Sequence, residues 1–356
     1  MNLEELQLLM NRLEQPVYRA VQVYEWLHQR NQNIADGTFT FAGMNNLPKN
    51  LREGLERQCY ITPVSVEKEL RAKDGTVKFL LAAGGDEPAP SRVYIESVLM
   101  EYVHGYSVCI STQAGCRMGC VFCATGHSGF LRNLSAGEMC MQVYMASKSS
   151  ATEGLSRNDG DRQRVRNVVL MGCGEPLDNF DASLKFIELI THPKGAGLSQ
   201  RHITLSTCGL VPQIRELAKR KMQITLAVSL HGPDDATRQA LMPIAKANPM
   251  KELLAACREY ANTTRRRITF EYALTEGVND SPAQARALAK LLKGLLCHVN
   301  LIPVNPVGIA NHSPTKKREA AVFASILQEA NIAATIRRTI GTEVNAACGQ
   351  LRAAKA

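Results

Sequence analysis

Three cysteines lie in one short, glycine-bounded stretch, GCRMGCVFCATG at residues 115–126, with the spacing C-x3-C-x2-C. Zinc and iron both accept thiolate ligands of the kind offered by Cys116, Cys120 and Cys123. A structural zinc ion takes four ligands, and His127 follows closely enough to complete a Cys3His site. A four-iron cluster takes one ligand for each iron, so three thiolates leave one iron open to another molecule. The stretch therefore favours a reactive iron–sulfur cluster, with structural zinc as the alternative.

The elements that would position this loop are strands alternating with helices. From Ser107 onward, short apolar and β-branched runs are separated by helical stretches. The runs are residues 107–112, 166–172, 201–207, 224–230, 267–274, 298–304 and, after one more helix, 333–338. Such alternation predicts an α/β fold with a parallel sheet. Six strand–helix units predict a partial (βα)6 barrel, in which the chemistry lies at the carboxyl ends of the strands.

Two segments precede this barrel. Residues 1–60 carry leucines and valines at helical spacing and predict a small helical accessory domain, whose basic residues are compatible with RNA binding. Residues 61–104 change to strand periodicity around a Lys-Asp-Gly turn, which is typical of a β-hairpin, and form an extension or linker. We assign the barrel core to residues 105–350, with a cysteine near its end.

The composition is that of a globular protein, with 45% hydrophobic and 21% charged residues. Lysine and arginine exceed aspartate and glutamate by 42 to 33, and the resulting net charge of +9 suits a polyanionic partner such as nucleic acid. The number of cysteines, 11, is odd, and the sequence shows no export signal. Both observations argue against a disulfide framework. No stretch is apolar enough for a membrane helix, so we expect a cytoplasmic monomer with no membrane contact.

A series of further motifs follows the cysteine loop in a fixed order. The motifs are QAGCRMGCVFCATGHSGFLRNL, VVLMGCGEPLDN, ITLSTCGLVP, LAVSLHGP, LMPI, GVND, LIPVNP and AACGQL. The first resembles the signature of radical S-adenosylmethionine (SAM) enzymes, and the whole series resembles the adenine methyltransferases RlmN and Cfr from about Val17 to Gln350. The resemblance implies a four-iron, four-sulfur cluster on the three cysteines. The methionine end of SAM would bind the open iron, and an electron would then split SAM to a 5′-deoxyadenosyl radical.

The same resemblance assigns residues to the SAM site. Gly174 and Glu175, in GCGEP, would meet the amino group of SAM, because glycine allows close approach and a carboxylate suits an ammonium group. Residues at or beyond the ends of later strands would contact the nucleoside or methionine part, namely Ser206, Ser229, Leu230, His231 and Asn305. Taken singly, each serine or asparagine reads as a cap or turn residue. Their joint position after successive strands favours the binding site.

Two more cysteines and a glutamate would complete the reaction. The resemblance implies that Cys348, in AACGQL, carries the transferred methyl group and that Cys109, in the first barrel strand, resolves the intermediate. Carbon 2 of adenine is electrophilic and cannot attack the methyl group of SAM directly. The family therefore methylates the cysteine, forms a carbon radical from that methyl group and links it to the ring. Glu96, in IESVLM, matches the family's proton acceptor, although taken alone it reads as a surface glutamate.

The implied substrates are an adenine in the peptidyl-transferase centre of 23S rRNA and, in some members, the adenosine beside the anticodon of tRNA. The implied reductant is flavodoxin or ferredoxin. The GEP tripeptide resembles the RlmN branch, which methylates carbon 2, and Cfr-like methylation of carbon 8 is the alternative. Two other classes remain open: a non-enzymatic RNA-binding protein with a structural metal loop, and a radical SAM enzyme that acts on a small molecule.

This chain departs from the family pattern at three motif edges. Cys173 stands where MGMGEP is usual, Gly232 replaces the alanine after SLH, and Ala245-Lys246 follow LMPI where asparagine is usual. A cysteine is a soft, polarizable replacement for methionine, so we do not assign Cys173 a catalytic role.

Overall fold

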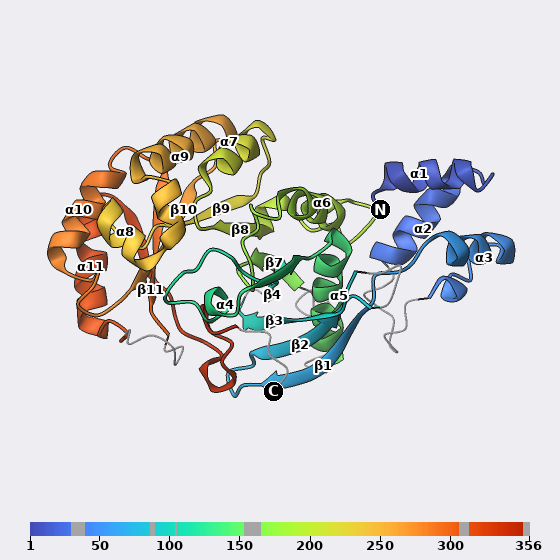
Figure 1. Cartoon of the computed structure of the whole chain (residues 1–356), viewed down its shortest axis with the longest axis horizontal. Coiled ribbons are helices and arrows are strands. Elements are labelled where there is room, and N and C mark those ends of the chain that lie inside the picture. Colours follow the sequence, from blue (N-terminus) through green and yellow to red (C-terminus); the bar gives the residue numbers. More distant parts are fainter. Residues whose placement is uncertain (30–39, 86–89, 104, 153–164, 306–312, 352–356) are drawn as a thin grey trace.

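The computed structural model describes residues 1–29, 40–85, 90–103, 105–152, 165–305 and 313–351. A ten-stranded sheet forms the body of the molecule, in the order β1-β2-β3-β4-β7-β8-β9-β10-β11-β12 (Figure 1). The strands are β1 Val64–Arg71, β2 Val77–Ala83, β3 Val93–Tyr102, β4 Gly105–Cys109, β7 Val165–Leu170, β8 Ile203–Thr207, β9 Thr225–Ser229, β10 Ile268–Leu274, β11 Cys297–Pro303 and β12 Ala333–Ile336. The sheet is open, with β1 and β12 at its edges, so the prediction of a partial barrel is confirmed.

The type of strand pairing changes once along this sheet, at β4. The pairs from β1 to β4 are antiparallel, and every pair from β4 to β12 is parallel. Residues 61–104, predicted as an extension, therefore supply three strands of the main sheet. The carboxyl ends of the parallel strands meet along one edge, where polar side chains that follow each strand come together.

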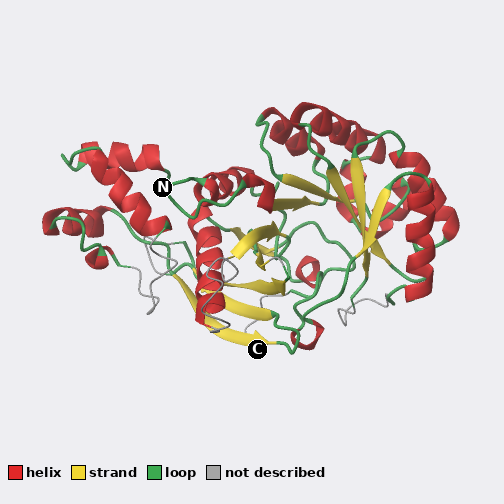
Figure 2. Cartoon of the chain, turned by 180° about the vertical axis from the view of Figure 1, so that it is seen from behind, coloured by secondary structure: helices red, strands yellow, loops and turns green. Residues whose placement is uncertain are grey.

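Helices cover the outer side of the parallel strands, with α7, α9, α10 and α11 along the rim (Figures 1 and 2). The helices of the body are α4 Ala124–His127, α5 Ala136–Thr152, α6 Phe180–Thr191, α7 Val211–Lys219, α8 Asp235–Leu241, α9 Met250–Thr264, α10 Pro282–Leu292 and α11 Lys317–Glu329. The short 3-10 turns are η3 Gln200–His202, η4 Pro243–Ala247 and η5 Thr342–Val344. In β8 the burial alternates, because Ile203 and Leu205 enter the core while Ser206 faces the other way.

The N-terminal segment is helical, as predicted. It comprises α1 Leu3–Arg12, α2 Tyr18–His28, the turn η2 Phe41–Gly43 and α3 Lys49–Gln58. A capping box between Asn2 and Glu5 begins α1. The apolar faces of these helices join the same hydrophobic core as the body, and the hydroxyl of Tyr24 donates to the carbonyl of Leu189 in α6 at 3.3 Å. The helices therefore pack on the α5–α6 side of the sheet, while the division of the chain at residue 60 stays a prediction.

A buried histidine ends α2 and links it to the body. His28 is 7% exposed, and its Nδ1 lies 2.7 Å from the hydroxyl of Tyr144 in α5. Burial, assisted by the N-terminal ammonium group and His192, lowers the pKa of His28 to about 3. His28 is therefore neutral in the folded protein throughout the physiological range.

We expect this histidine to make stability depend on pH. Below about pH 6.5 the unfolded chain binds a proton at His28 that the folded chain does not, so the free energy of unfolding falls as the pH falls toward about 3. Between about pH 7.5 and about pH 5.5 the loss is about 1.4 kcal/mol for this group. Trp26, the one tryptophan of the chain, reports the unfolding of α2 by fluorescence in urea. The variant His28→Gln should lose about 1.4 kcal/mol less than the wild type, and equal losses would contradict the assignment.

Candidate active site

A cavity of about 170 Å³ lies at the carboxyl ends of the parallel strands. The predicted residues that line it are Cys116, Cys120, Cys123, Gly174, Glu175, Ser206, Ser229, His231, Asn305 and Cys348. They come from the carboxyl-terminal ends of β8 and β9, from the loops after β4, β7, β9 and β11 and from the C-terminal segment, which the fold brings to one place. The predicted residue Leu230 does not line the cavity, and it is fully buried, at 0% exposed.

The cysteine loop is held between two short elements. Strand β5, Gln113–Gly115, precedes Cys116, and helix α4 begins directly after Cys123. β5 pairs with β6, Phe130–Asn133, and the amide of Cys116 donates to the carbonyl of Gly129 at 2.9 Å. Gly115 has a φ of +78°, and a Cβ there would lie 1.8 Å from the carbonyl oxygen of Gly129. Only glycine fits this crossing, which is why the loop begins with one.

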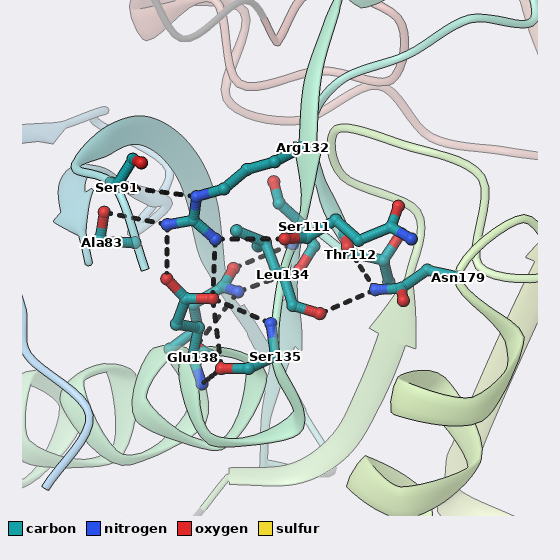
Figure 3. Close-up of polar contacts among 11 residues, drawn as sticks. Ala83, Ser91, Ser111, Thr112, Arg132, Leu134, Ser135, Glu138 and Asn179 are labelled. Carbon is teal, nitrogen blue, oxygen red and sulfur yellow. Dashed lines mark hydrogen bonds and ion pairs between the residues drawn. The ribbon is translucent and has the colours of Figure 1, made fainter. Parts of the chain in front are cut away.

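An ion pair attaches β6, the partner strand of β5, to helix α5 (Figure 3). The guanidinium of Arg132 donates to both carboxylate oxygens of Glu138 in α5, at 2.9 and 2.6 Å. The carboxylate also accepts from the amide of Ser135 at 2.8 Å, and Arg132 donates to the carbonyls of Ser91 and Ala83. The Glu138 side chain is 0% exposed and that of Arg132 is 18% exposed, so the pair lies mostly inside the protein. Bidentate pairing of this kind sets both position and orientation.

The three thiols fit an iron–sulfur cluster better than a single metal ion. They share one wall of the cavity, and burial raises the pKa of the Cys116 thiol to about 12, so a bound cation is needed to ionise it. Among the described residues, no group of three or more His, Cys, Asp or Glu side chains is gathered around one point for a metal ion. The predicted zinc ligand His127 places its Nε2 at 3.2 Å from the carbonyl of Val121 and does not line the cavity. A cluster binds each thiolate through a different iron and so needs no common point.

Glu175 presents a carboxylate beside the three cysteines. Its two oxygens accept from the amides of Leu177 at 2.9 Å and Cys208 at 2.7 Å. Burial raises the pKa of this carboxyl group, and these hydrogen bonds oppose the rise. Gly174 has a φ of +109°, and a Cβ there would lie 2.6 Å from the Cβ of Gln113. The strand end is therefore closed around a carboxylate that could receive an ammonium group.

His231 is fixed as a hydrogen-bond donor toward the cavity. It follows β9 with a φ of +57°, and its Nδ1 accepts from the amide of Ala273 at 2.9 Å. The ring of Phe122 packs edge-on against it, with centroids 4.7 Å apart. Burial lowers the pKa of His231 to about 3, so the ring is neutral and its proton is on Nε2. The conformation and tautomer of this side chain are set before any ligand binds.

The two other predicted cysteines meet at a second cavity of about 30 Å³. We call it the small cavity, and the cavity of about 170 Å³ at the strand ends the large cavity. Cys109 is 8% exposed, and β4 pairs it with Val98 of β3 and Val169 of β7. Burial, followed by the proximity of Cys348, raises the pKa of the Cys109 thiol to about 12. Cys348 is partly exposed and lines both cavities. The fold thus brings together two cysteines that are 239 positions apart, since 348 − 109 = 239.

The segment around Cys348 is held by backbone hydrogen bonds. Asn305 donates through its Nδ2 to the carbonyl of Cys348 at 3.1 Å. The amide of Ala124, the first residue of α4, donates to the carbonyl of Gly349 at 2.8 Å. Thr125 donates through its hydroxyl to the carbonyl of Leu351. The cysteine loop and the C-terminal segment are therefore attached to each other.

Comparison with known proteins places this site in a family. Residues 110–289 match the Radical SAM superfamily, and residues 1–61 match the Ribosomal RNA large subunit methyltransferase N-terminal domain. The chain is 46% identical over 351 residues, 98% of this chain and 96% of the other, to a Probable dual-specificity RNA methyltransferase RlmN of Clostridium novyi (strain NT). It is 44% identical over 353 residues, 99% of this chain and 94% of the other, to the protein of the same description in Clostridium tetani (strain Massachusetts / E88). The chain belongs to the RlmN family.

A solved structure agrees with this assignment. The crystal structure of a radical SAM methyltransferase from Sphaerobacter thermophilus has a TM-score of 0.90 and 41% identity, and the match covers 99% of this chain and 98% of that one. Membership of the RlmN family makes the chain a radical SAM RNA methyltransferase, and this kind of enzyme implies a four-iron, four-sulfur cluster and SAM. The structural-metal and small-molecule alternatives are therefore wrong. None of the helices in the described ranges has the length and apolar character that a membrane span needs.

Glu96 is buried, although the sequence around it, taken alone, indicates a surface glutamate. It is 6% exposed, and its Oε1 lies 2.7 Å from the Nζ of Lys78 on β2. That Nζ also donates to the carbonyl of Asn345 at 3.1 Å, three residues before Cys348. Glu96 lines neither cavity, but it shares a face of β3 with Val98, which packs beside Cys109. In this RlmN-type enzyme the predicted proton acceptor is thus tied to the C-terminal segment through a lysine.

Two charged residues of the cavity were not predicted from the sequence. Glu271 on β10 is 5% exposed and accepts from the Nδ2 of Asn300 at 2.8 Å, and Arg337 follows β12. The one available signal was a glutamate inside the apolar run RITFEYAL, since a charge in a buried strand needs a partner or a function.

Cys173, at the RlmN position where methionine is usual, lies outside both cavities. It is 1% exposed, packs with Val98, Cys109 and Leu351, and lies 3.5 Å from the hydroxyl of Thr125. Burial raises the pKa of its thiol, which makes it a poor nucleophile.

We expect Cys173→Ala to leave RNA methylation within about twofold of the wild type, at a cost of about 1 kcal/mol from the lost packing. Methyl incorporation into RNA and urea unfolding measure the two effects. A hundredfold fall in methylation by folded protein would give Cys173 a part in the chemistry.

Proposed function

We propose that this enzyme methylates carbon 2 of an adenine in the peptidyl-transferase centre of 23S rRNA, and the adenosine beside the anticodon in tRNA. The observation that carries the proposal is the position of Cys348, which lines one cavity with the cluster cysteines and another with Cys109. The relatives are described as dual-specificity RNA methyltransferases, which supports two RNA substrates. A flavodoxin- or ferredoxin-type protein would supply the electron, and the enzyme would act as a cytoplasmic monomer.

The large cavity suits SAM bound at an iron–sulfur cluster. Cys116, Cys120 and Cys123 would hold the cluster, and the Glu175 carboxylate would accept from the amino group of SAM. Hydroxyl groups of Ser206 and Ser229, and the Nε2 proton of His231, would contact the remaining polar groups. When bound, cluster and SAM supply a radical that removes a hydrogen atom from a carbon beside them.

The chain's own residues would then carry the methyl group to RNA. The Cys348 thiolate would take a methyl group from one SAM molecule: a sulfur lone pair would form the new bond to carbon, the methyl–sulfonium bond would break and S-adenosylhomocysteine would leave. After hydrogen abstraction, the methylene carbon on Cys348 would bond to the adenine ring, so that RNA is attached to the protein. The unpaired electron left on the ring would return to the cluster as the ring proton is lost. Glu96 accepts the ring proton. The Cys109 thiol would attack the Cys348 sulfur and the sulfur–methylene bond would break. The released carbon would take up the proton that the thiol gives up, so that methylated RNA leaves while the two cysteines form a disulfide.

Burial of Cys109 suits this order of events. A thiol with a raised pKa stays protonated and does not compete with Cys348 for the methyl group of SAM. The GEP tripeptide, which includes Glu175, favours carbon 2 over carbon 8. A flipped or unpaired adenine is needed, because ring carbons inside a base stack are out of reach.

The experiment is mass spectrometry of rRNA and tRNA nucleosides from cells with and without this protein. We expect 2-methyladenosine to disappear from both RNA classes in its absence and to return with the wild-type gene but not with a Cys348→Ala gene. Loss of 8-methyladenosine instead would assign the Cfr-like reaction, and loss from rRNA alone would remove tRNA as a substrate.

A further inference from the structure

Arg337 is placed at the junction of the two cavities. It follows β12 directly, and its backbone amide donates to the carbonyl of Leu301 on β11 at 2.8 Å, so sheet pairing continues past the end of the strand. Its side chain lines the large cavity with the cluster cysteines and the small one with Cys109. Within the described part of the chain, it is the one charged residue that lines both cavities. Cys348 lines both as well.

The guanidinium of Arg337 is not committed to another group in the described residues. No described side chain lies within hydrogen-bonding or ion-pair distance of it. By contrast, Arg132 is paired with Glu138, and Arg238 donates to backbone carbonyls. Glu271, the acidic residue of the cavity whose charge acts on Arg337, accepts a hydrogen bond from Asn300. A partly buried guanidinium without a fixed partner is a costly arrangement unless a charge arrives during function.

Cys348 is the neighbour that acts most strongly on Arg337. The proximity of Cys348 is the largest cause of a raised pKa for this guanidinium, ahead of Glu271, Tyr102 and Cys109, while burial opposes it. Arg337 also acts on Cys109, but there burial outweighs it and the thiol pKa stays at about 12. The same cation is thus near two cysteines, of which one is exposed to the cavity and the other is buried.

We propose that Arg337 is a positioning residue that gives the cavity-exposed Cys348 a positive electrostatic environment, while burial opposes its effect at Cys109, so that Cys348 is the cysteine that accepts the methyl group. This inference rests on the proposed function. A cation beside a sulfur attracts the negative charge that the sulfur carries as a nucleophile, and it orients that sulfur by attraction. At Cys109 the cost of burying a charge outweighs the attraction of the same arginine. One arginine can therefore distinguish the two cysteines.

Other charged or titratable groups line the two cavities beside Cys348, and they are the same in every variant of Arg337. Besides the cluster cysteines, these are Glu175, Cys208, His231 and Glu271 in the large cavity and Cys109 and Arg338 in the small one. Arg338 is exposed and lines only the small cavity, which makes it a matched control for charge removed one residue away.

The test compares two thiol reagents of opposite charge at Cys348. The purified full chain, kept free of oxygen and loaded with its cluster, is treated with a negatively charged and a positively charged methanethiosulfonate, and modification of the Cys348 peptide is timed by mass spectrometry. A nearby cation favours the negative reagent. The ratio of the two rates should fall on the order of tenfold in Arg337→Gln, return to within about twofold in Arg337→Lys, and change less than about threefold in Arg338→Gln.

The rate ratio reports the charge at the sulfur, and a general disturbance of the fold affects both reagents alike. An unchanged ratio in Arg337→Gln would overturn the inference, as would an equal fall in Arg338→Gln. The proposed function is tested separately by searching wild-type protein incubated with SAM for S-methylated Cys348. Its absence would remove the methyl-carrier role while leaving the measured charge of the site intact.

Discussion

In a Cys109→Ala variant, RNA should remain covalently attached to the protein, whereas a Cys348→Ala variant should give neither attached nor methylated RNA. The reason is the proposed attack of Cys109 on the Cys348 sulfur, which the meeting of the two cysteines at the small cavity supports. Without that attack the sulfur–carbon bond to RNA has no route to break. Denaturing gels of reactions with labelled RNA show the adduct, and mass spectrometry locates it on Cys348.

The double variant Cys109→Ala/Cys348→Ala is the matched control and should give no adduct. We expect methylation to fall by at least about a thousandfold in each single variant, which is the scale seen when a covalent nucleophile is removed. Adducts with both single variants, or with neither during turnover, would contradict this division of roles. Iron content should stay near that of the wild type, because neither residue belongs to the cluster loop.

Much of the fold and part of the site could be predicted, because their signals are local. Alternating strand and helix patterns, the spacing of Cys116, Cys120 and Cys123, and the glycine before them act within a few residues of the chain. The parallel sheet then brings the strand ends together without further information. This is why Ser206 and His231 line the same cavity although each alone reads as an ordinary loop residue.

The rest depends on contacts between distant segments. The ion pair of Lys78 and Glu96 follows from the register of β2 and β3, and no pattern in either strand indicates that both are buried. Asn305 lines the cavity, and its side chain also donates to the carbonyl of Cys348, 43 positions away, a contact that no local pattern indicates. Arg337 is one basic residue among 42, and only its position past β12 distinguishes it.

The predicted extension has a structural role that its sequence did not indicate. Asp74, in the β1–β2 turn, accepts from the amide of Gly341 at 2.8 Å, and the backbone of Lys73 donates to Glu343 at 3.2 Å. Lys78 also donates to the carbonyl of Asn345, so the hairpin makes three hydrogen bonds to the segment that leads to Cys348. The segment that carries the cysteine is therefore positioned from both ends, by the hairpin before it and by α4 after it.

The variant Glu138→Ala should lose about 3–5 kcal/mol of stability and much of its iron. Its removal leaves the guanidinium of Arg132, which is 18% exposed, without the two oxygens that it now contacts at 2.9 and 2.6 Å. An unpaired buried charge of this kind is strongly destabilising. Because β6 then loses its anchor to α5, β5 loses its partner strand immediately before Cys116. Urea unfolding, with iron and sulfide per chain in folded protein, measures both effects.

Two controls distinguish the effect of losing this buried ion pair from the effect of losing an exposed one. Glu252→Ala removes an exposed partner of Arg215, at 3.1 Å, and should change stability by less than about 1 kcal/mol with iron unchanged. The double variant Arg132→Met/Glu138→Met replaces the pair by apolar side chains and leaves no unpaired charge, so it should be more stable than Glu138→Ala alone. If Glu138→Ala cost no more than Glu252→Ala, the cysteine loop would have to be held in place by the β5–β6 backbone pairing alone. In that case the Gly115–Gly129 crossing, where a Cβ would lie 1.8 Å from the carbonyl oxygen, would be the decisive feature.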